Sequence, residues 1–489
     1  MSIAPTKAKL KPWKLYLDGK WQDARSGRTF TTINPATEEP LCECAAAGAE
    51  DVDLAVRAAR QAFAEGPWPR MAAADRGAAL LKVAQLIEKH RDEIAELETL
   101  NQGKPIGDSS RVDVPLTAAC FRYYAGFADK LEGRTIPVRG PYLAYTLREP
   151  IGVIAAIVPW NYPLLLATYK VAPALAAGNA VILKPASQTP LTALRLGEII
   201  EEAGLPPGIF QVITGSGREC GQAIVEHAGI DKIALTGSTE TGRHVMQSAA
   251  KNLTKLELEL GGKSPNIVFA DADLEEAAKG ATIGIFLNKG EICTAGSRLF
   301  VETKVKDQLL EKLVGRAKKL RQGDPLDPQT RLGPQVSKEH RESILRYVET
   351  GKKEGASLVL GGGVPPELPR GWFVQPTIFD GVANEMTIAQ EEIFGPVLAV
   401  IPFESFDDVL RQANQSQFGL AAGVWTRDIK KAHRAARALQ AGTVWVNTYN
   451  LFDPTAPYGG FKKSGFGREL GSAGIEEYTQ LKSVWIDLS

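Results

Sequence analysis

The sequence predicts an α/β protein organised around mostly parallel sheets. From residue 151 onward, short apolar runs of strand length alternate with helical runs, as in "VIAAIVP", "LLLATYKVAPALAAGN" and "AVILKP". Strands joined by helices at this spacing form right-handed βαβ units, which place the strands parallel in one sheet. The length of 489 residues allows two or three domains.

Local signals also identify the elements that precede and follow this series. The early elements are a hairpin around Asp18-Gly19, helical periodicity at 50–65 and 72–100, and the alternation of a long exposed ribbon at 135–150. The βα series continues through "TALRLGEIIEEAG", "IFQVIT", "GSGRECGQAIVEHAG", "KIALTG", "STETGRHVMQSAAK" and "KLELELGG". A second alternating series covers 266–460, and 480–488 has the pattern of a terminal strand. Because ligands gather outside the carboxyl ends of parallel strands, the residues just after each strand are the candidates for a site.

Composition excludes several classes of function. Lys plus Arg (57) balances Asp plus Glu (57), which gives no basic surface excess for nucleic acid. The longest apolar run, at 151–160, is far shorter than a membrane span, and the start "MSIAPTKAKLKPWK" is polar and basic, so we expect a cytoplasmic protein without membrane association. Five cysteines form no disulfide framework and have no zinc-ligand spacing, and the five histidines are far apart, so no metal site is expected.

Three turns at strand ends could hold a nucleotide. They are "GSGRECG" (215–221), "GSTETG" (237–242) and "KPASQTP" (184–190). In the second turn, Arg243 and His244 stand where a P-loop needs Lys and Ser or Thr, which argues against ATP chemistry. Each turn alone could be an ordinary βα connection; three in succession favour cofactor binding without naming the cofactor.

One cysteine has unusual surroundings. Cys293 stands in "NKGEICTAGSR" (288–298), between two glycines and among polar residues, whereas a packed cysteine usually has apolar neighbours.

Several motifs together resemble those of the aldehyde dehydrogenase superfamily. They are "PWN" (159–161), "TGSTETG" (236–242), "LELGGKSP" (258–265), "GEICTAGSR" (290–298), "EEIFGPV" (391–397) and "YGGFKKSGFGRELG" (458–471). The likeness covers essentially the whole chain, and within the family the sequence is similar to NAD(P)-dependent enzymes, including betaine-type and aryl or alkyl aldehyde dehydrogenases.

The resemblance implies two doubly wound Rossmann-like parallel-sheet domains plus a small β bridging and oligomerisation element. The implied parts are an NAD(P)-binding domain at 1–127 and 150–260, a catalytic domain at 261–461, and a bridging element at 128–149 and 470–489. A homodimer or a homotetramer is the implied assembly.

The resemblance implies oxidation of an aldehyde to the carboxylic acid. Cys293 would attack the aldehyde carbon, and the thiohemiacetal would lose hydride to become a thioester that water cleaves. Asn161 and the backbone N–H of Cys293 match the oxyanion hole. Strand alternation does not choose between Glu257 and Glu259, but the family motif selects Glu259 as the base for the deacylating water. Lys170 and Glu469 match positions of a proton relay or of residues that support the site. Snorkelling explains Lys170 equally well, and a structural ion pair with Arg468 or another cation explains Glu469 equally well.

The same resemblance assigns residues to the cofactor. The matching positions are Val158, Pro159, Trp160, Lys184, Ser187, Gly217, Gly237, Ser238, Glu392 and Phe394. Lys184 would bind the adenosine ribose, Ser238 the pyrophosphate and Glu392 the nicotinamide ribose. Many NAD-preferring members have Glu where this chain has Ser187, so we expect activity with NADP beside NAD.

The implied substrate pocket is defined by Tyr162, Tyr169, Leu287 and Tyr458. Leu287 interrupts the aromatic box with which betaine-type members hold a cationic group, which favours a neutral aliphatic or aromatic aldehyde. A betaine or ω-aminoaldehyde dehydrogenase is the alternative, because three tyrosines still offer ring faces. A cysteine-dependent ester hydrolase and a non-catalytic binding protein are the other readings; the Gly-rich turns argue against the first, and intact Cys293, Asn161 and Glu259 against the second.

Overall fold

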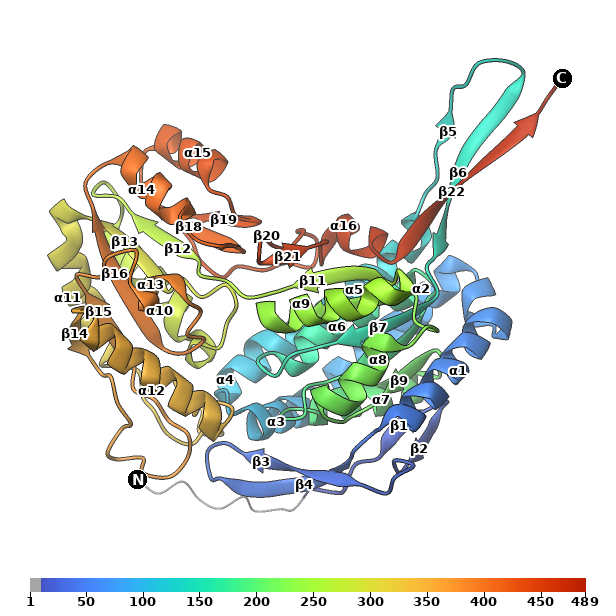
Figure 1. The fold of residues 1–489 in the computed structure, drawn as a ribbon, viewed down its shortest axis with the longest axis horizontal. Helices are drawn as coiled ribbons and strands as arrows, with labels where there is room; N and C mark the ends of the chain where they lie inside the picture. The colour runs from blue at the N-terminus through green and yellow to red at the C-terminus, as the bar shows by residue number, and fades with distance from the viewer. Residues whose placement is uncertain (1–9) are drawn as a thin grey trace.

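Strands and helices alternate through two separate parallel sheets, from which a β ribbon projects (Figure 1). This computed structural model describes residues 10–489. The segment 1–9, on which the expected cytoplasmic location partly rests, lies outside the described residues. In the part of the chain that is described, no helix has both the length and the apolar character needed to cross a lipid bilayer.

The first sheet has eight strands. Their spatial order is β2 (Lys20–Gln22), β1 (Leu15–Leu17), β9 (Phe210–Val212), β8 (Ala180–Lys184), β7 (Val153–Ile157), β10 (Lys232–Thr236), β11 (Lys255–Glu259) and β21 (Gly465–Phe466). The five central strands from β9 to β11 are parallel, and the outer strands are antiparallel to their neighbours. The chain builds outward from β7 to β9 on one side, then returns to place β10 and β11 on the other. The direction of winding therefore reverses between β7 and β10, where a doubly wound sheet opens a crevice for ligands.

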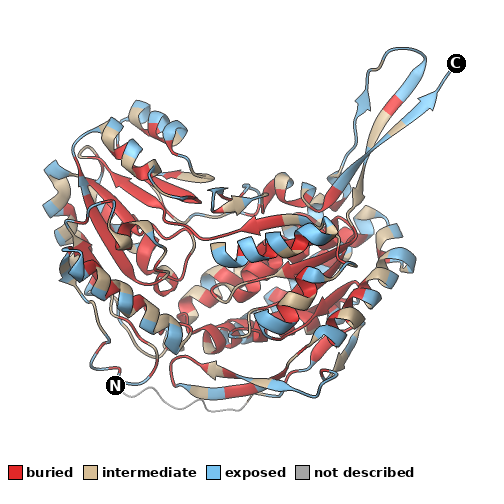
Figure 2. Ribbon diagram, in the orientation of Figure 1, coloured by how far each residue is buried: buried red, intermediate tan, exposed pale blue. Residues whose placement is uncertain are grey.

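Helices cover the first sheet, whose central strands are buried along nearly their whole length (Figure 2). The helices of this half are α1 (Ala49–Glu65), α2 (Ala73–Lys89), α3 (Arg91–Gln102), α4 (Ile106–Asp108), α5 (Val114–Phe127), α6 (Pro163–Ala176), α7 (Leu191–Ala203), α8 (Gln222–Glu226) and α9 (Thr239–Ala249). Every residue of α6 is buried, because α6 lies between the strands β7 and β8 and the helices α2 and α5. This explains why its sequence is apolar all round.

Two sequence expectations in this half need correction. The helix expected at 72–100 is two helices, α2 and α3, which meet at His90. The His90 backbone leaves the helical region while the side-chain periodicity continues, and no Gly or Pro marks the break. The helix expected after "GSG" begins as a π-helical turn at 217–221 and continues only as the short α8.

The second sheet has seven strands with helices on both faces. Their order is β14 (Ser357–Leu360), β15 (Thr377–Asp380), β16 (Val397–Phe403), β13 (Arg298–Glu302), β12 (Pro265–Val268), β18 (Ala421–Trp425) and β19 (Thr443–Val446). Its helices are α10 (Leu274–Phe286), α11 (Lys306–Ala317), α12 (Lys338–Lys353), α13 (Thr387–Gln390), α14 (Phe406–Asn414) and α15 (Ile429–Ala438). Along β16, Val397, Ala399 and Ile401 join one apolar core, whereas Leu398 and Val400 join another. Alternate residues thus bury opposite faces of the sheet, as expected for a doubly wound domain.

The ribbon joins two segments that are distant in sequence. β6 (Tyr142–Pro150) pairs along its full length with β22 (Thr479–Asp487), antiparallel, and β5 (Thr135–Ile136) continues the three-stranded sheet. The expected ribbon and terminal strand are therefore confirmed, and Gly140, with φ 89°, lies in the segment that joins β5 to β6. The remaining elements are the hairpin β3 (Thr29–Asn34) and β4 (Glu39–Ala45), the pair β17 (Phe418–Gly419) and β20 (Phe461–Lys462), and α16 (Gly471–Glu476).

Candidate active site

A cavity of 410 Å³ lies where the two sheets face each other. The carboxyl ends of β7 and β10 border it from the first sheet, at the reversal of winding. Segments that lead into the amino ends of β12, β13 and β16 border it from the second sheet. The lining residues are Ile157, Val158, Pro159, Trp160, Asn161, Leu166, Leu235, Thr236, Gly237, Ser238, Thr241, Leu260, Gly261, Cys293, His340, Glu392 and Phe394. The fold thus brings Cys293 and Asn161, which are 132 positions apart in the sequence, to one cavity.

Cys293 is the one cysteine of the chain that is not buried. Its Sγ lies 3.2 Å from the hydroxyl of Tyr458. Desolvation raises the pKa of the Cys293 thiol to about 12, against the opposing effect of the Tyr458 hydrogen bond. Charge repulsion from Glu392, Glu259 and Glu469 also raises this pKa, so ionisation of the thiol requires a nearby base or positive charge.

The backbone that leads to Cys293 is strained. Asn288 and Lys289 have φ values of 44° and 62°, in the left-handed region, and Gly290 follows with φ 81°. Each of the two non-glycine residues costs roughly 1–3 kcal/mol in this conformation, and such residues cluster at functional sites. At Gly290 a Cβ would stand 2.2 Å from the backbone of Gly395, so only glycine fits there.

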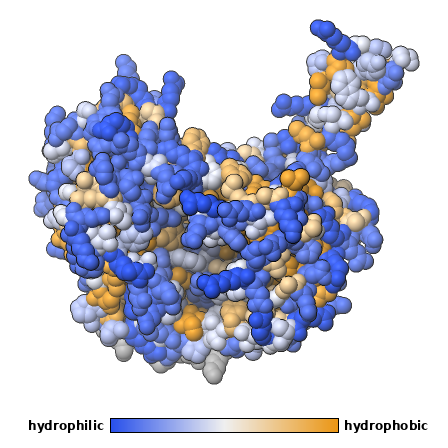
Figure 3. Space-filling view, in the orientation of Figure 1, coloured by the Kyte–Doolittle hydropathy of each residue, from blue (hydrophilic) through white to orange (hydrophobic). Residues whose placement is uncertain are grey.

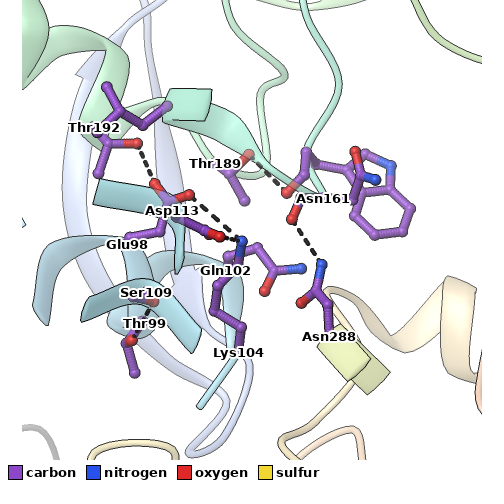
Figure 4. Close-up of polar contacts among 12 residues, drawn as sticks. Glu98, Thr99, Gln102, Lys104, Ser109, Asp113, Asn161, Thr189, Thr192 and Asn288 are labelled. Carbon is purple, nitrogen blue, oxygen red and sulfur yellow. Dashed lines mark hydrogen bonds and ion pairs between the residues drawn. The ribbon is translucent and has the colours of Figure 1, made fainter. Parts of the chain in front are cut away.

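Asn161 is buried and held by the loop that carries Cys293. Its Nδ2 donates to the backbone carbonyl oxygen of Glu291 at 3.0 Å. Its backbone carbonyl accepts from Nδ2 of Asn288 at 2.9 Å (Figure 4). A carboxamide nitrogen carries two hydrogens, so the second N–H of Asn161 remains for a ligand. The Asn161 side chain can therefore donate to an oxygen that is bound beside Cys293.

Glu257 and Glu259 have different surroundings although both are buried on β11. Glu257 forms an ion pair of 2.7 Å with Lys232. The carboxyl oxygens of both residues are buried without a hydrogen-bond partner, but no ion pair to Glu259 is found among residues 10–489. Burial raises the pKa of Glu259 well above its usual range, with further repulsion from Glu469 and a smaller opposing effect from Lys170. A buried carboxyl with a raised pKa and free oxygens takes up a proton at higher pH than an exposed carboxyl does.

Lys170 and Glu469 form a fully buried ion pair. The Lys170 ammonium also donates to Oγ1 of Thr236 at 2.6 Å, and Thr236 lines the cavity. Burial raises the pKa of Glu469, and the charge of Lys170 opposes that rise. The partner of Glu469 is thus Lys170 and not Arg468, whose guanidinium donates to the carbonyls of Gly460 and Gly467.

Most residues assigned to the cofactor line the cavity. Val158, Pro159, Trp160, Gly237, Ser238, Glu392 and Phe394 do so, whereas Lys184, Ser187 and Gly217 lie outside its lining. Lys184 nevertheless adjoins the lining, because Val158 N–H donates to the Lys184 carbonyl at 3.1 Å, and Ser187 Oγ donates to the Gly215 carbonyl at 2.9 Å.

The side chains around the cavity fit a dinucleotide. Ser238 is the N-cap of α9 and presents the positive end of that helix to the cavity. The buried Lys184 ammonium donates to the Pro185 carbonyl at 3.0 Å, and an ammonium has three donors. Oε1 of Glu392 is anchored by the N–H of Gly262 at 2.9 Å, and burial raises the pKa of Glu392 to about 7. Groups that can bind a phosphate, ribose hydroxyls and an aromatic ring are therefore all found in or beside one crevice.

Sequence reasoning missed His340, which lines the cavity from α12. Its Nε2 lies 2.8 Å from the carbonyl oxygen of Phe394, and its ring packs edge-on against Trp160 with 5.0 Å between centroids. Phe394 itself has φ 58°. His340 therefore holds in place the segment that contains Phe394 and Glu392. His340 lies in a helical stretch with no motif around it, so the sequence did not indicate this contact. Among residues 10–489 no cluster of three or more His, Cys, Asp or Glu side chains could hold a metal ion.

None of the four residues assigned to the substrate is in the lining of the 410 Å³ cavity, although the Tyr458 hydroxyl contacts the thiol of Cys293. Tyr162 and Leu287 are half-buried and pack against the same core as Phe452, a residue that the sequence did not single out. Tyr458 lies against Phe452 with 5.6 Å between ring centroids, and Tyr169 is buried. The Lys104 ammonium, paired with Asp113 and Glu98, lies 4.1 Å from the centroid of the Tyr162 ring. Figure 4 shows this buried cluster beside Asn161.

Comparisons with known proteins agree with this geometry. The sequence model described as "Aldehyde dehydrogenase family" matches residues 21–484. A mitochondrial aldehyde dehydrogenase of Equus caballus is 50% identical over 476 residues, which cover 97% of this chain and 95% of that protein. The solved structure of an aldehyde dehydrogenase from Bacillus cereus with NAD+ superposes with a TM-score of 0.97, at 47% identity, over 100% of both chains. An indole-3-acetaldehyde dehydrogenase solved with NAD+ gives a TM-score of 0.96 at 45% identity, over 97% of both chains.

Proposed function

The chain belongs to the aldehyde dehydrogenase family, and from that premise we propose that Cys293 is the nucleophile with which it oxidises a neutral aliphatic or aromatic aldehyde to the carboxylic acid, using NAD(P). The observation that carries the proposal is one juxtaposition. A half-buried thiol, a carboxamide with a second N–H, and residues that match the family's cofactor positions meet at a single cavity.

The first half of the reaction forms a bond between Sγ and the aldehyde carbon. The thiol loses its proton, the sulfur adds to the carbonyl carbon, and the electron pair of the C=O bond moves to the oxygen. We propose that this oxyanion accepts hydrogen bonds from the second Nδ2 hydrogen of Asn161 and from the backbone N–H of Cys293. Preorganised donors of this kind typically contribute roughly two to three orders of magnitude in rate.

The second half releases the acid. Once held by Ser238 and Glu392, NAD(P) would supply the hydride acceptor with which the thiohemiacetal on Cys293 is oxidised to a thioester. Glu259 then removes a proton from water, whose oxygen attacks the thioester carbon and displaces the sulfur. One aldehyde, one water and one oxidised cofactor thus give one acid, one reduced cofactor and one proton, and the thiol is restored. The partnerless, buried carboxyl of Glu259 supports this role, since a proton acceptor must be free of fixed partners.

Lys170 and Glu469 are proposed to carry the Glu259 proton away. Glu469 raises the pKa of Glu259 by charge repulsion, and Lys170 lowers it by attraction. Both effects require proximity in a medium of low dielectric constant. The buried pair therefore sets the charge around the proposed base, and Thr236 links the pair to the cavity.

The cofactor residues divide by chemistry. Lys184 is proposed to bind the adenosine ribose hydroxyls, Ser238 and the start of α9 the pyrophosphate, and Glu392 the nicotinamide ribose. Trp160 and Phe394, whose rings meet edge-to-face at 5.2 Å between centroids, form an apolar wall of the same crevice. On this assignment the half of the chain at 1–127 and 150–260 binds the cofactor, 261–461 supplies the nucleophile, and 128–149 with 470–489 bridges subunits.

Ser187 leads to a prediction about cofactor choice. Its hydroxyl donates to the Gly215 carbonyl and brings no negative charge, so a 2′-phosphate meets no repulsion. Wild-type enzyme should therefore turn over with NADP as well as NAD. Ser187→Glu should lower kcat/KM for NADP by about tenfold or more relative to NAD, because like charges at close range cost at least ~1.4 kcal/mol. Parallel kinetics with both cofactors check this; negligible wild-type turnover at saturating NADP would contradict it.

The substrate pocket supports neutral aldehydes over cationic ones. Leu287 is apolar, and the Tyr162 ring already has an ammonium of the protein, Lys104, within cation–π distance. The Tyr162 ring therefore already holds a cation of the protein and is not free to select a cationic substrate.

We expect kcat/KM for hexanal and benzaldehyde to exceed that for betaine aldehyde by about tenfold, equivalent to roughly 1.4 kcal/mol. NADH absorbance over such a panel measures the ranking. If kcat/KM is instead higher for the cationic aldehydes, the protein is a betaine or ω-aminoaldehyde dehydrogenase, and the assignment of a neutral substrate is wrong.

A cysteine-dependent ester hydrolase is the second candidate for the same site. Attack of Sγ on an activated ester would give the same thioester, which Glu259 and water would cleave without a cofactor. The dinucleotide crevice beside Cys293 makes this a side activity of the dehydrogenase.

The ribbon supports a homo-oligomer, either dimer or tetramer. Its strands expose Tyr142, Leu143, Leu147, Leu481, Trp485, Ile486 and Leu488 to solvent, and apolar side chains gather there in Figure 3. β22 is also an unpaired sheet edge, which a second copy of the chain could cover. The five cysteines are all unpaired, which supports the proposed cytoplasmic location.

A further inference from the structure

A buried ion pair flanks Gly290 in the loop that carries the nucleophile. Lys289 Nζ and Glu291 Oε2 are 2.7 Å apart, and neither side chain has any solvent exposure. Lys289 has a left-handed backbone, so it does not hold its place through regular secondary structure. Neither charged group takes part in the steps assigned to Cys293, Asn161 and Glu259.

The pair ties this loop to both halves of the molecule. Oε2 of Glu291 accepts from Nε2 of Gln102 at 2.6 Å, and Oε1 accepts from the N–H of Val336 at 2.9 Å. The Lys289 ammonium donates to Oε1 and to the backbone carbonyl of Gln102, at 2.8 and 3.0 Å. Gln102 ends α3 beside the first sheet, and Val336 precedes α12 beside the second. The position of the loop is thus fixed from two sides.

The backbone of Glu291 then fixes Asn161. Its carbonyl oxygen accepts from Nδ2 of Asn161 at 3.0 Å and from Nδ2 of Asn288 at 3.2 Å. A carbonyl only accepts hydrogen bonds, so Asn161 must turn its nitrogen, and not its oxygen, toward it. The remaining N–H of that nitrogen is the proposed oxyanion donor. Any shift of Glu291 would move or flip this donor.

We propose that the Lys289–Glu291 pair is a positioning device for the oxyanion donor Asn161, with both residues acting through the Glu291 carbonyl. The inference rests on the proposed function, because it matters only if Asn161 stabilises an oxyanion. Removing one charge of a buried pair leaves the other uncompensated, and the loop must then move to solvate it. A misplacement of about 1 Å near a reacting centre can cost on the order of a hundredfold in rate.

The test is a mutant cycle with Asn161. Wild type, Glu291→Gln, Asn161→Ala and the Glu291→Gln/Asn161→Ala double variant are compared by NADH formation with saturating aldehyde and NAD. Glu291→Gln should lower kcat by about tenfold to a hundredfold. KM for the aldehyde and Kd for NAD, measured by protein fluorescence, should change by less than about threefold because ground-state binding does not use the oxyanion donor. In the Asn161→Ala background, Glu291→Gln should cause almost no further loss.

Controls separate positioning from general damage. Lys306 and Asp380 form an ion pair of 2.6 Å, and neither residue lines the cavity. Asp380→Asn removes the charge of one partner and should leave kcat unchanged. If Glu291→Gln does not fold, as judged by circular dichroism, the Lys289→Gln/Glu291→Gln double variant replaces it, since that variant leaves no unpaired charge.

Additive losses in the cycle, or unchanged kcat in Glu291→Gln, would overturn the positioning role alone. Unchanged kcat in Asn161→Ala would overturn the oxyanion assignment as well as the positioning role.

Discussion

Cys293→Ser is expected to lose aldehyde oxidation by on the order of 10⁴-fold or more while still binding NAD. A serine hydroxyl keeps the geometry but is a far weaker nucleophile than a thiolate, and removal of a nucleophile typically has an effect of this size. The rate is measured by NADH absorbance with saturating aldehyde, and NAD binding by quenching of protein fluorescence.

The chain offers a matched control for this substitution. Cys42 is buried in β4, remote from the cavity, so Cys42→Ser should retain turnover. It tests whether the loss of any thiol damages the enzyme. Turnover by Cys293→Ser within tenfold of wild type would exclude a covalent role for the thiol, since no other cysteine of the chain is accessible to a substrate.

Glu259→Gln should separate the two halves of the reaction. Acylation does not need the base for water, so the first turnover should still release about one NADH for each active site. Steady-state kcat should then fall by about 10²- to 10⁴-fold, because general-base catalysis typically contributes that much. Stopped-flow absorbance resolves the burst from the slow phase.

The raised pKa of Glu259 fixes the direction of the pH dependence. The carboxylate form is the proposed base, and burial shifts the formation of this carboxylate to higher pH than for an exposed glutamate. Wild-type kcat should therefore rise as pH increases through this raised pKa. The kcat of Glu259→Gln should show no such rise. Glu257→Gln is the control, since Glu257 is engaged by Lys232 and should be dispensable for the water step. If Glu257→Gln instead shows the burst and the slow phase, then Glu257, and not Glu259, is the base that activates water.

The site could be predicted from sequence wherever it depends on strand ends. "VIAAIVP" and "KIALTG" are recognisable as buried strands, and the residues that follow them, such as Asn161 and Ser238, meet at the reversal between β7 and β10. This follows from the connectivity of parallel sheets alone. The roles of those residues came from the family resemblance, because an asparagine after a strand could equally be a helix cap.

Long-range polar contacts could not be predicted from local patterns. The partner of Glu469 is Lys170, 299 positions away, and periodicity contains no information about such a pair. The same holds for Glu257 and Glu259, which share one strand face but differ in whether a lysine reaches them. His90 shows a further limit, because side-chain periodicity continues across a backbone break that no Gly or Pro announces.

The covalent role of Cys293 is tested most directly by the mass of the protein during turnover. Glu259→Gln, mixed with benzaldehyde and NAD and quenched in acid, should gain the mass of one benzoyl group, and that mass should map to the peptide that contains Cys293. One equivalent of NADH should accompany it. Continued NADH formation with no adduct, or an adduct on another residue, would contradict the account.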